Sequence, residues 1–215
     1  MQRATTDHAK DQRRNSLLHA ALNEFFNKGF SAARMEDIAK HAQVSKGTLY
    51  LYFANKQDLF KALIEEVAIP TISRTSQHAL ATKTGAEALQ TLMQNIAGLI
   101  RDTPLPKLVK VIIADGKAFP ELVKFYREQM LERMFNLLET LITRSVESKE
   151  WQCSDIPMTA RLIVAPIIFS VVWRMVFEVS EDEKSQLNLD ALFKLHTQYL
   201  LLVLSTNSET NNDKS

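Results

Sequence analysis

Apolar residues recur at helical spacing along almost the whole chain. The 215 residues include only five glycines and six prolines, the residues that most often end helices and form turns. Leucine, isoleucine and phenylalanine instead recur every three or four positions, which is the period of a helix with one buried face. No convincing segment alternates apolar and polar residues in the way that is typical of a strand. The sequence therefore predicts an all-α fold.

Two short helices joined by a tight turn are predicted near the N-terminus, after a longer helix that begins at Arg13. Gly29 should end that first helix, because glycine readily adopts the left-handed conformation that follows a helix. Gln43-Val44 forms the predicted turn, and Ser45 should cap the next helix through its hydroxyl. This arrangement is typical of a helix-turn-helix DNA-binding module. Further along, Thr103-Pro104 is expected to open a short helix.

The helix after the turn, predicted from Lys46 to Phe53, has an inward and an outward face. Leu49 and Phe53 lie four residues apart and should pack inward. The remaining side chains suit contacts to phosphates and base edges in a major groove, although a solvated face that binds nothing is the alternative interpretation. The residues predicted to contact DNA are Arg34, Lys46, Gly47, Thr48, Tyr50, Tyr52 and Lys56.

Charge is distributed unevenly along the chain. Residues 1–60 contain nine basic and six acidic residues, whereas the whole chain carries a net charge of only +1. A basic end on a mildly acidic body suits a protein that turns one end toward phosphates. Net charge alone does not identify a nucleic-acid-binding protein.

Residues 13–66 resemble the DNA-binding region of the TetR/AcrR family of bacterial regulators. The matching stretches are Ala20-Ala21-Leu22, Phe25-Phe26, Gly29, Ile38-Ala39, Val44 to Tyr50, Tyr52-Phe53, Asn55-Lys56 and Leu59. The resemblance implies a repressor that binds a near-palindromic DNA operator as a homodimer. It also implies dimerisation through the last two helices, here about 157–179 and 188–204. Where Ala33-Arg34 stands, the family usually has a small hydroxyl residue; Arg34 is expected to contact a phosphate or a base instead.

These patterns and the resemblance predict about nine helices and divide the chain into four segments. They are a flexible N-terminus (1–12), a helix-turn-helix domain (13–56), a helical effector-binding and dimerisation domain (57–204) and a disordered tail (205–215). Soft apolar side chains in the C-terminal half suit a pocket for a small, apolar effector, although ordinary core packing also explains them. The predicted pocket residues are Met93, Phe119, Phe125, Tyr126, Met130 and Trp173.

Several classes of protein are not supported. The histidines form no pair at helical spacing and no cluster with Cys153, so neither a metal site nor a cofactor is predicted. A single cysteine fits a reducing compartment and a cytoplasmic location. The run from Leu162 to Trp173 is shorter than the roughly 20 residues that span a bilayer, and no constellation of catalytic groups predicts an enzyme. An activator, or a DNA-binding regulator without a small-molecule effector, remains the alternative.

Overall fold

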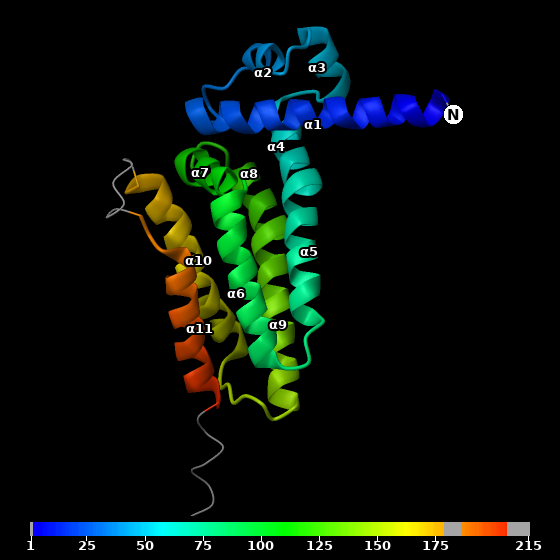
Figure 1. The fold of residues 1–215 in the computed structure, drawn as a ribbon. Coiled ribbons are helices and arrows are strands. Elements are labelled where there is room, and N and C mark those ends of the chain that lie inside the picture. The colour runs from blue at the N-terminus through cyan, green and yellow to red at the C-terminus, as the bar shows by residue number, and fades with distance from the viewer. Residues whose placement is uncertain (1, 179–185, 206–215) are drawn as a thin grey trace, which may run out of the picture. The chain divides into compact units, whose positions relative to one another are not determined.

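The structure is a computed structural model that describes residues 2–178 and 186–205, and every regular element in these ranges is a helix. The prediction of an all-α fold is confirmed (Figure 1). The elements are α1 (Gln2–Lys28), α2 (Met35–His41), α3 (Lys46–Tyr52), α4 (Lys56–Ala62), the π-helix η1 (Leu63–Ala68), α5 (Ile69–Leu80), α6 (Gly85–Asp102), α7 (Pro106–Asp115), α8 (Pro120–Tyr126), the π-helix η2 (Arg127–Leu131), α9 (Glu132–Glu147), α10 (Ile156–Val176) and α11 (Leu189–Ser205). Because α4, η1 and α5 are continuous, as are α8, η2 and α9, the described ranges form nine unbroken helices.

The first helix is longer than the sequence predicts. It begins at Gln2 rather than at Arg13, so most of the segment predicted to be flexible is helical. Nothing interrupts it there, since residues 2–28 include no glycine or proline, and the side chains of Gln12 and His8 are joined by a hydrogen bond of 3.1 Å across one turn. Gly29 ends the helix with a φ of 80°, as predicted. The predicted tail lies, from residue 206 onward, outside the described residues.

Of the two helix starts predicted from capping residues, the one at Ser45 is confirmed. The hydroxyl of Ser45 accepts a hydrogen bond from the Thr48 amide at 3.0 Å, which fixes the start of α3. The prediction for Thr103-Pro104 is wrong. Thr103 ends α6, and its hydroxyl donates back to the Leu99 carbonyl at 2.6 Å, so α7 starts only at Pro106. A threonine hydroxyl can serve either end of a helix, and sequence alone does not separate the two uses.

The chain divides into two compact units whose boundaries differ from the predicted ones. The first contains Met1–Pro70 and Lys107–Met130, and the second contains Thr71–Pro106 and Leu131–Ser215. Helices α7 and α8 therefore belong to the same unit as the helix-turn-helix. Asp115 at the end of α7 accepts a hydrogen bond from the Phe30 amide at 2.7 Å, and the Phe119 ring lies 4.8 Å from the Phe30 ring. These contacts bind the loop after α1 to the α7–α8 connection.

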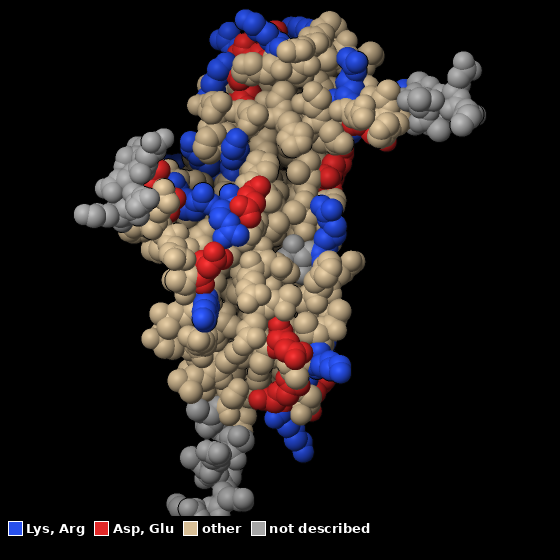
Figure 2. Space-filling model, viewed as in Figure 1, with Lys and Arg blue, Asp and Glu red and all other residues tan. Residues whose placement is uncertain are grey.

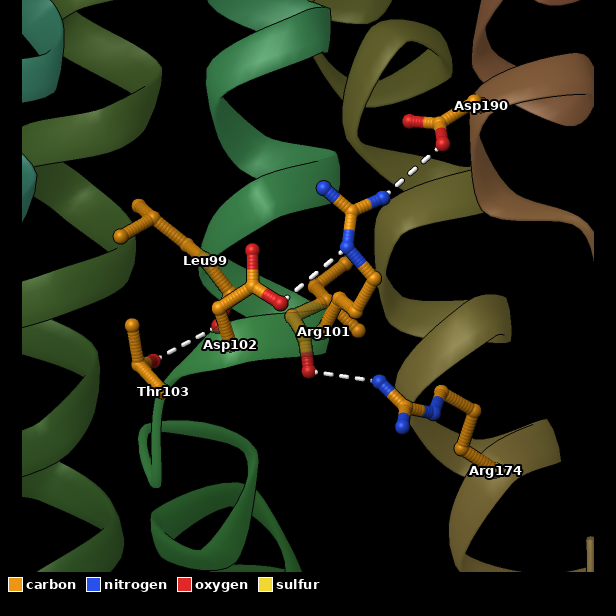
Figure 3. Close-up of polar contacts among 7 residues, drawn as sticks. Leu99, Arg101, Asp102, Thr103, Arg174 and Asp190 are labelled. Carbon is orange, nitrogen blue, oxygen red and sulfur yellow. Dashed lines mark hydrogen bonds and ion pairs between the residues drawn. The ribbon is translucent and has the colours of Figure 1, made fainter.

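In the second unit, α6 packs between α9 and α11, and α10 packs on α9 and α11 (Figure 1). Two arginines join these helices at one end (Figure 3). Arg101 of α6 pairs with Asp190 of α11 at 2.9 Å, and Arg174 of α10 donates to the Ile100 carbonyl of α6 at 2.7 Å. The packing of α10 and α11 on α6 and α9 determines which of their faces stay exposed, and these polar contacts add to it at one end.

Candidate DNA-binding interface

Helix α3 is held in place by a buried apolar side. Leu49 is fully buried and Phe53 is 3% exposed, which confirms that both side chains point inward. The Arg14 guanidinium of α1 lies 4.4 Å from the centre of the Phe53 ring and pairs with both carboxylate oxygens of Glu66, at 2.7 and 2.5 Å. Since α1, α3 and η1 meet at this cluster, the orientation of α3 is set by the packed unit and not by the short helix itself.

The opposite side of α3 is open to solvent. Successive side chains of a helix are about 100° apart, so Gly47 and Leu51 lie at the centre of the face opposite Leu49. Lys46 and Tyr50 flank this centre on one side, and both are exposed. Thr48 and Tyr52 flank it on the other side and are half-buried. An outward face with hydroxyls at both edges and an ammonium at one of them suits a helix that lies in a major groove.

Lys46 forms an ion pair with Glu36 of α2 in the free protein, and both side chains are 55% exposed. The hydrogen bond to Glu36 raises the pKa of Lys46, and the bond from Lys46 lowers the pKa of Glu36. The Lys46 ammonium also lies 5.8 Å from the centre of the Tyr50 ring. Exposed pairs of this kind contribute little to stability, so Lys46 can exchange Glu36 for a phosphate at small cost.

Arg34 stands immediately before α2, in an extended conformation with no side-chain cap to the helix. Its side chain is exposed, whereas the neighbouring Ala33 is 3% exposed. The missing cap agrees with the sequence, which has no hydroxyl residue at either position. The position leaves the Arg34 guanidinium directed to solvent beside the helix-turn-helix, and its contact with DNA stays a prediction.

The side chain of Lys56 does not point to solvent with the outward side chains of α3. Its ammonium donates to the carbonyls of Phe30, Ser31 and Ala33 at 2.7, 2.8 and 3.3 Å. An ammonium has three donors, and all three are used inside the first unit. Burial lowers the pKa of Lys56, an effect that the charge of Asp115 partly opposes. Lys56 therefore braces the loop between α1 and α2, and its predicted contact with a phosphate stays a prediction.

The residues predicted to line an effector pocket fall in different units. Phe119, Phe125, Tyr126 and Met130 belong to the first unit, and Met93 and Trp173 to the second. Tyr126 is 9% exposed, and burial raises its pKa to about 12. The Trp173 ring lies between those of Phe169 and Phe177, at centroid distances of 5.6 and 4.9 Å and tilted by 42° and 44°. Their assignment to a common pocket stays a prediction.

One cavity in the second unit includes a predicted residue. It has a volume of about 540 Å³ and lies between α6 and α11. Its lining combines apolar, amide and charged side chains: Gln90, Met93, Gln94, Ala97, Asp190, Phe193, Lys194, Thr197 and Gln198. Met93 alone of the six predicted pocket residues lines it.

Helices α10 and α11 expose apolar side chains that the single chain does not cover. These side chains are 47% to 70% exposed, and they are Met158, Leu162, Phe169, Val176, Leu195, Tyr199, Leu202 and Val203. On α10, residues 158, 162 and 169 follow helical spacing, and residues 195, 199 and 202 do the same on α11. Figure 2 shows an uncharged surface over the C-terminal half of α11, where residues 195–205 include no Asp, Glu, Lys or Arg. The monomer therefore presents a continuous apolar stripe on each helix.

By length and composition alone, α10 also passes as a membrane-spanning helix, and 33% of its most apolar window is buried in the structure. A core helix of a soluble protein passes the same test.

Among the described residues, no group of three or more His, Cys, Asp or Glu side chains is placed to hold a metal ion.

Sequence reasoning missed three residues of this unit. The sequence pattern assigns no role to Leu51, although its apolar side chain falls at an outward position one turn after Gly47. Arg14 and Asp115 gave no usable signal, because their partners lie 52 and 85 residues away in the chain.

Comparison with protein families gives two matches. Residues 17–63 match the bacterial regulatory proteins of the tetR family, and residues 87–192 match the C-terminal domain of AefR-like transcriptional repressors. The chain is 24% identical to the uncharacterized HTH-type transcriptional regulator YfiR of Bacillus subtilis over 157 residues, 70% of this chain and 73% of the relative. It is 40% identical over 75 residues to the HTH-type transcriptional activator FasR of Mycolicibacterium smegmatis, 35% of this chain and 34% of that protein.

Solved structures share the fold. The transcriptional regulator FadR from Bacillus subtilis, in complex with stearoyl-CoA, superposes with a TM-score of 0.73 at 24% identity, over 86% of this chain and 96% of that one. AibR, in complex with isovaleryl coenzyme A and operator DNA, superposes with a TM-score of 0.67 at 16% identity, over 90% of this chain and 98% of that one.

Proposed function

The chain belongs to the TetR family of bacterial regulatory proteins and is a transcriptional regulator, and from this we propose that it is a repressor that binds a near-palindromic operator as a homodimer. The observation that carries the proposal is the outward face of α3, which presents Lys46, Gly47 and Tyr50 to solvent on a helix fixed by buried Leu49. The match to AefR-like repressors favours repression over activation. A cytoplasmic location follows from the same proposal.

The dimer places two copies of α3 in successive major grooves, roughly 34–36 Å apart. In each copy, Lys46, Thr48, Tyr50 and Tyr52 contact phosphates along the edges of the groove, and Gly47 lets the backbone approach the DNA. Arg34 adds a contact from the start of α2. The apolar stripes on α10 and α11 support pairing through these two helices. When a second copy covers this exposed apolar surface, its removal from water stabilises the dimer.

The proposed effector is an acyl-CoA thioester. Two proteins with this fold were solved with such ligands, stearoyl-CoA in FadR and isovaleryl coenzyme A in AibR. The ligand must bind the DNA-competent and DNA-incompetent conformations with different affinities, since equal binding shifts no equilibrium. Release from the operator then follows from the differential affinity.

A thermal-denaturation series tests the effector class. At a concentration 100 times its Kd, an acyl-CoA should stabilise the folded protein by about 2.7 kcal/mol, and the unfolding temperature should rise. Stearoyl-CoA and isovaleryl-CoA are compared with free coenzyme A, which lacks the acyl chain and should have a smaller effect. If neither thioester raises the unfolding temperature or releases DNA, the acyl-CoA effector is rejected while the DNA-binding proposal stands.

Lys46→Ala tests the phosphate contact. The variant should bind all DNA sequences more weakly by a similar factor, and the slope of log K against log salt should flatten by about one unit per protomer. Fluorescence anisotropy at several salt concentrations measures that slope. The matched control is Lys83→Ala, an exposed lysine of the second unit, which should leave the slope unchanged. An unchanged slope for Lys46→Ala would remove Lys46 from the contact set.

Activation is the second candidate, because the relative FasR is a transcriptional activator. Repression and activation predict opposite changes in transcription from the regulated promoter when the protein is absent. Deleting the gene should raise transcription from that promoter if the protein represses it, and a fall would identify an activator.

A further inference from the structure

The most exposed large apolar side chain in the described ranges lies on the recognition helix. Leu51 is 86% exposed, which exceeds even the apolar stripe residues of α10 and α11. Single exposed leucines are common on protein surfaces, so exposure alone assigns no role. The position of Leu51 on α3 is the feature that separates it from an ordinary surface leucine.

Leu51 and Gly47 form the centre of the outward face, one helical turn apart. The polar groups lie at the edges, with Lys46 and Tyr50 on one side and Thr48 and Tyr52 on the other. A Cβ atom added at Gly47 would meet only the Ser45 hydroxyl within 4 Å, at 3.8 Å. The space around Gly47 is otherwise open within 4 Å, so Leu51 is the exposed side chain at the centre of this face.

Chemistry limits what Leu51 can contact there. Its side chain has no hydrogen-bond donor or acceptor, so it cannot read the N7, O6, N6 or N4 groups of the major groove. The apolar group that a base edge presents in that groove is the C5-methyl of thymine. Contact between the two removes both from water and costs no hydrogen bond. Cytosine at the same position carries a hydrogen at C5 instead of the methyl group and presents its N4 amino donor nearby, so the leucine would lose its apolar partner.

We propose that Leu51 is a specificity-determining residue that contacts a thymine C5-methyl in each half-site of the operator. The inference rests on the proposed function, since it needs α3 to lie in a major groove. It adds the class of base pair that the helix selects, and it divides the outward face into an apolar centre that discriminates bases and polar edges that contact phosphates.

The test removes the methyl group and nothing else. Each thymine of a bound operator is replaced in turn by deoxyuridine, symmetrically in both half-sites, and affinity is measured by fluorescence anisotropy. At one symmetric position, the wild-type protein should lose about 3- to 5-fold affinity per half-site, the value expected for one buried methyl-sized group. At the same position, Leu51→Ala should bind the thymine and deoxyuridine operators equally.

Two controls keep the result interpretable. Ile113→Ala changes another exposed apolar side chain, on α7, and should keep the wild-type sensitivity to deoxyuridine. Leu51→Gln keeps the size of the side chain and should also lose the sensitivity, and circular dichroism checks that both Leu51 variants are folded. If wild type binds the operator but tolerates deoxyuridine everywhere, or if Leu51→Ala stays as sensitive as wild type, the inference is overturned alone. If wild type binds no selected DNA, the proposed function is overturned with it.

Discussion

Leu162→Glu should convert the protein into a folded monomer and weaken operator binding by about 100-fold or more. Leu162 lies in the apolar stripe of α10 and is 57% exposed in the single chain, so the monomer tolerates a carboxylate there. In a two-fold dimer the same patch is used by both copies, and the substitution buries two carboxylates. An unpaired buried charge costs several kcal/mol, which is enough to dissociate the pair.

The loss of DNA affinity follows from the loss of the dimer. A monomer engages one half-site and forfeits the effective concentration that links the second half-site to the first, typically a factor of 10² to 10⁴. Analytical ultracentrifugation measures the oligomeric state, and anisotropy measures operator affinity. Ile113→Glu is the matched control, because Ile113 is also 57% exposed but lies on α7. If Leu162→Glu remains dimeric, the copies pair through another face.

Lys56→Met should lower the free energy of unfolding by about 2–3 kcal/mol, since three hydrogen bonds from a charged donor are lost and their carbonyls lose a partner. Methionine keeps the aliphatic stem, so packing changes little. The ammonium also lies over the Phe30 ring at 4.9 Å and near the Phe119 ring at 5.8 Å, and the substitution removes both contacts. Urea denaturation measures the effect.

The comparison with Lys46→Met distinguishes a lysine that contacts phosphate from a lysine that stabilises the fold. The sequence predicts the same role, a phosphate contact, for both. Lys46 pairs with Glu36 at the surface, so its loss should leave the unfolding free energy within about 0.5 kcal/mol of wild type. It should flatten the salt dependence of DNA binding, which Lys56→Met should not do. Wild-type stability of Lys56→Met together with a flattened salt slope would contradict the bracing role and support the phosphate contact that the sequence predicts for Lys56.

The sequence predicts the helix-turn-helix well because its signals are local. Ser45 needs only the amide of Thr48 three residues later, and Leu49 needs only helical spacing to be assigned to the core. Each of these features is set within one or two turns of helix, where capping and periodicity decide the conformation. The same logic succeeds at Gly29, whose positive φ follows directly from its place after the helix.

The sequence does not predict contacts between residues that lie far apart in the chain. Lys56 stands beside a DNA-binding helix and carries the right charge, but its donors are taken by carbonyls 23 to 26 residues earlier in the chain. Phe119 is predicted to line an effector pocket, and the sequence does not predict that its ring packs on Phe30 in the first unit. Both outcomes depend on which helices fold against each other. Helical spacing assigns a buried face to each helix without naming its partner.

Selection of bound sequences from random double-stranded DNA tests the central claim most directly. A homodimer that reads DNA with α3 should enrich one near-palindrome, with half-sites whose centres lie about one helical turn apart or a multiple of it. Enrichment of a single asymmetric half-site would contradict the dimeric mode of binding. No enrichment over the starting pool, with folded protein at low salt, would contradict the account of α3 as a recognition helix.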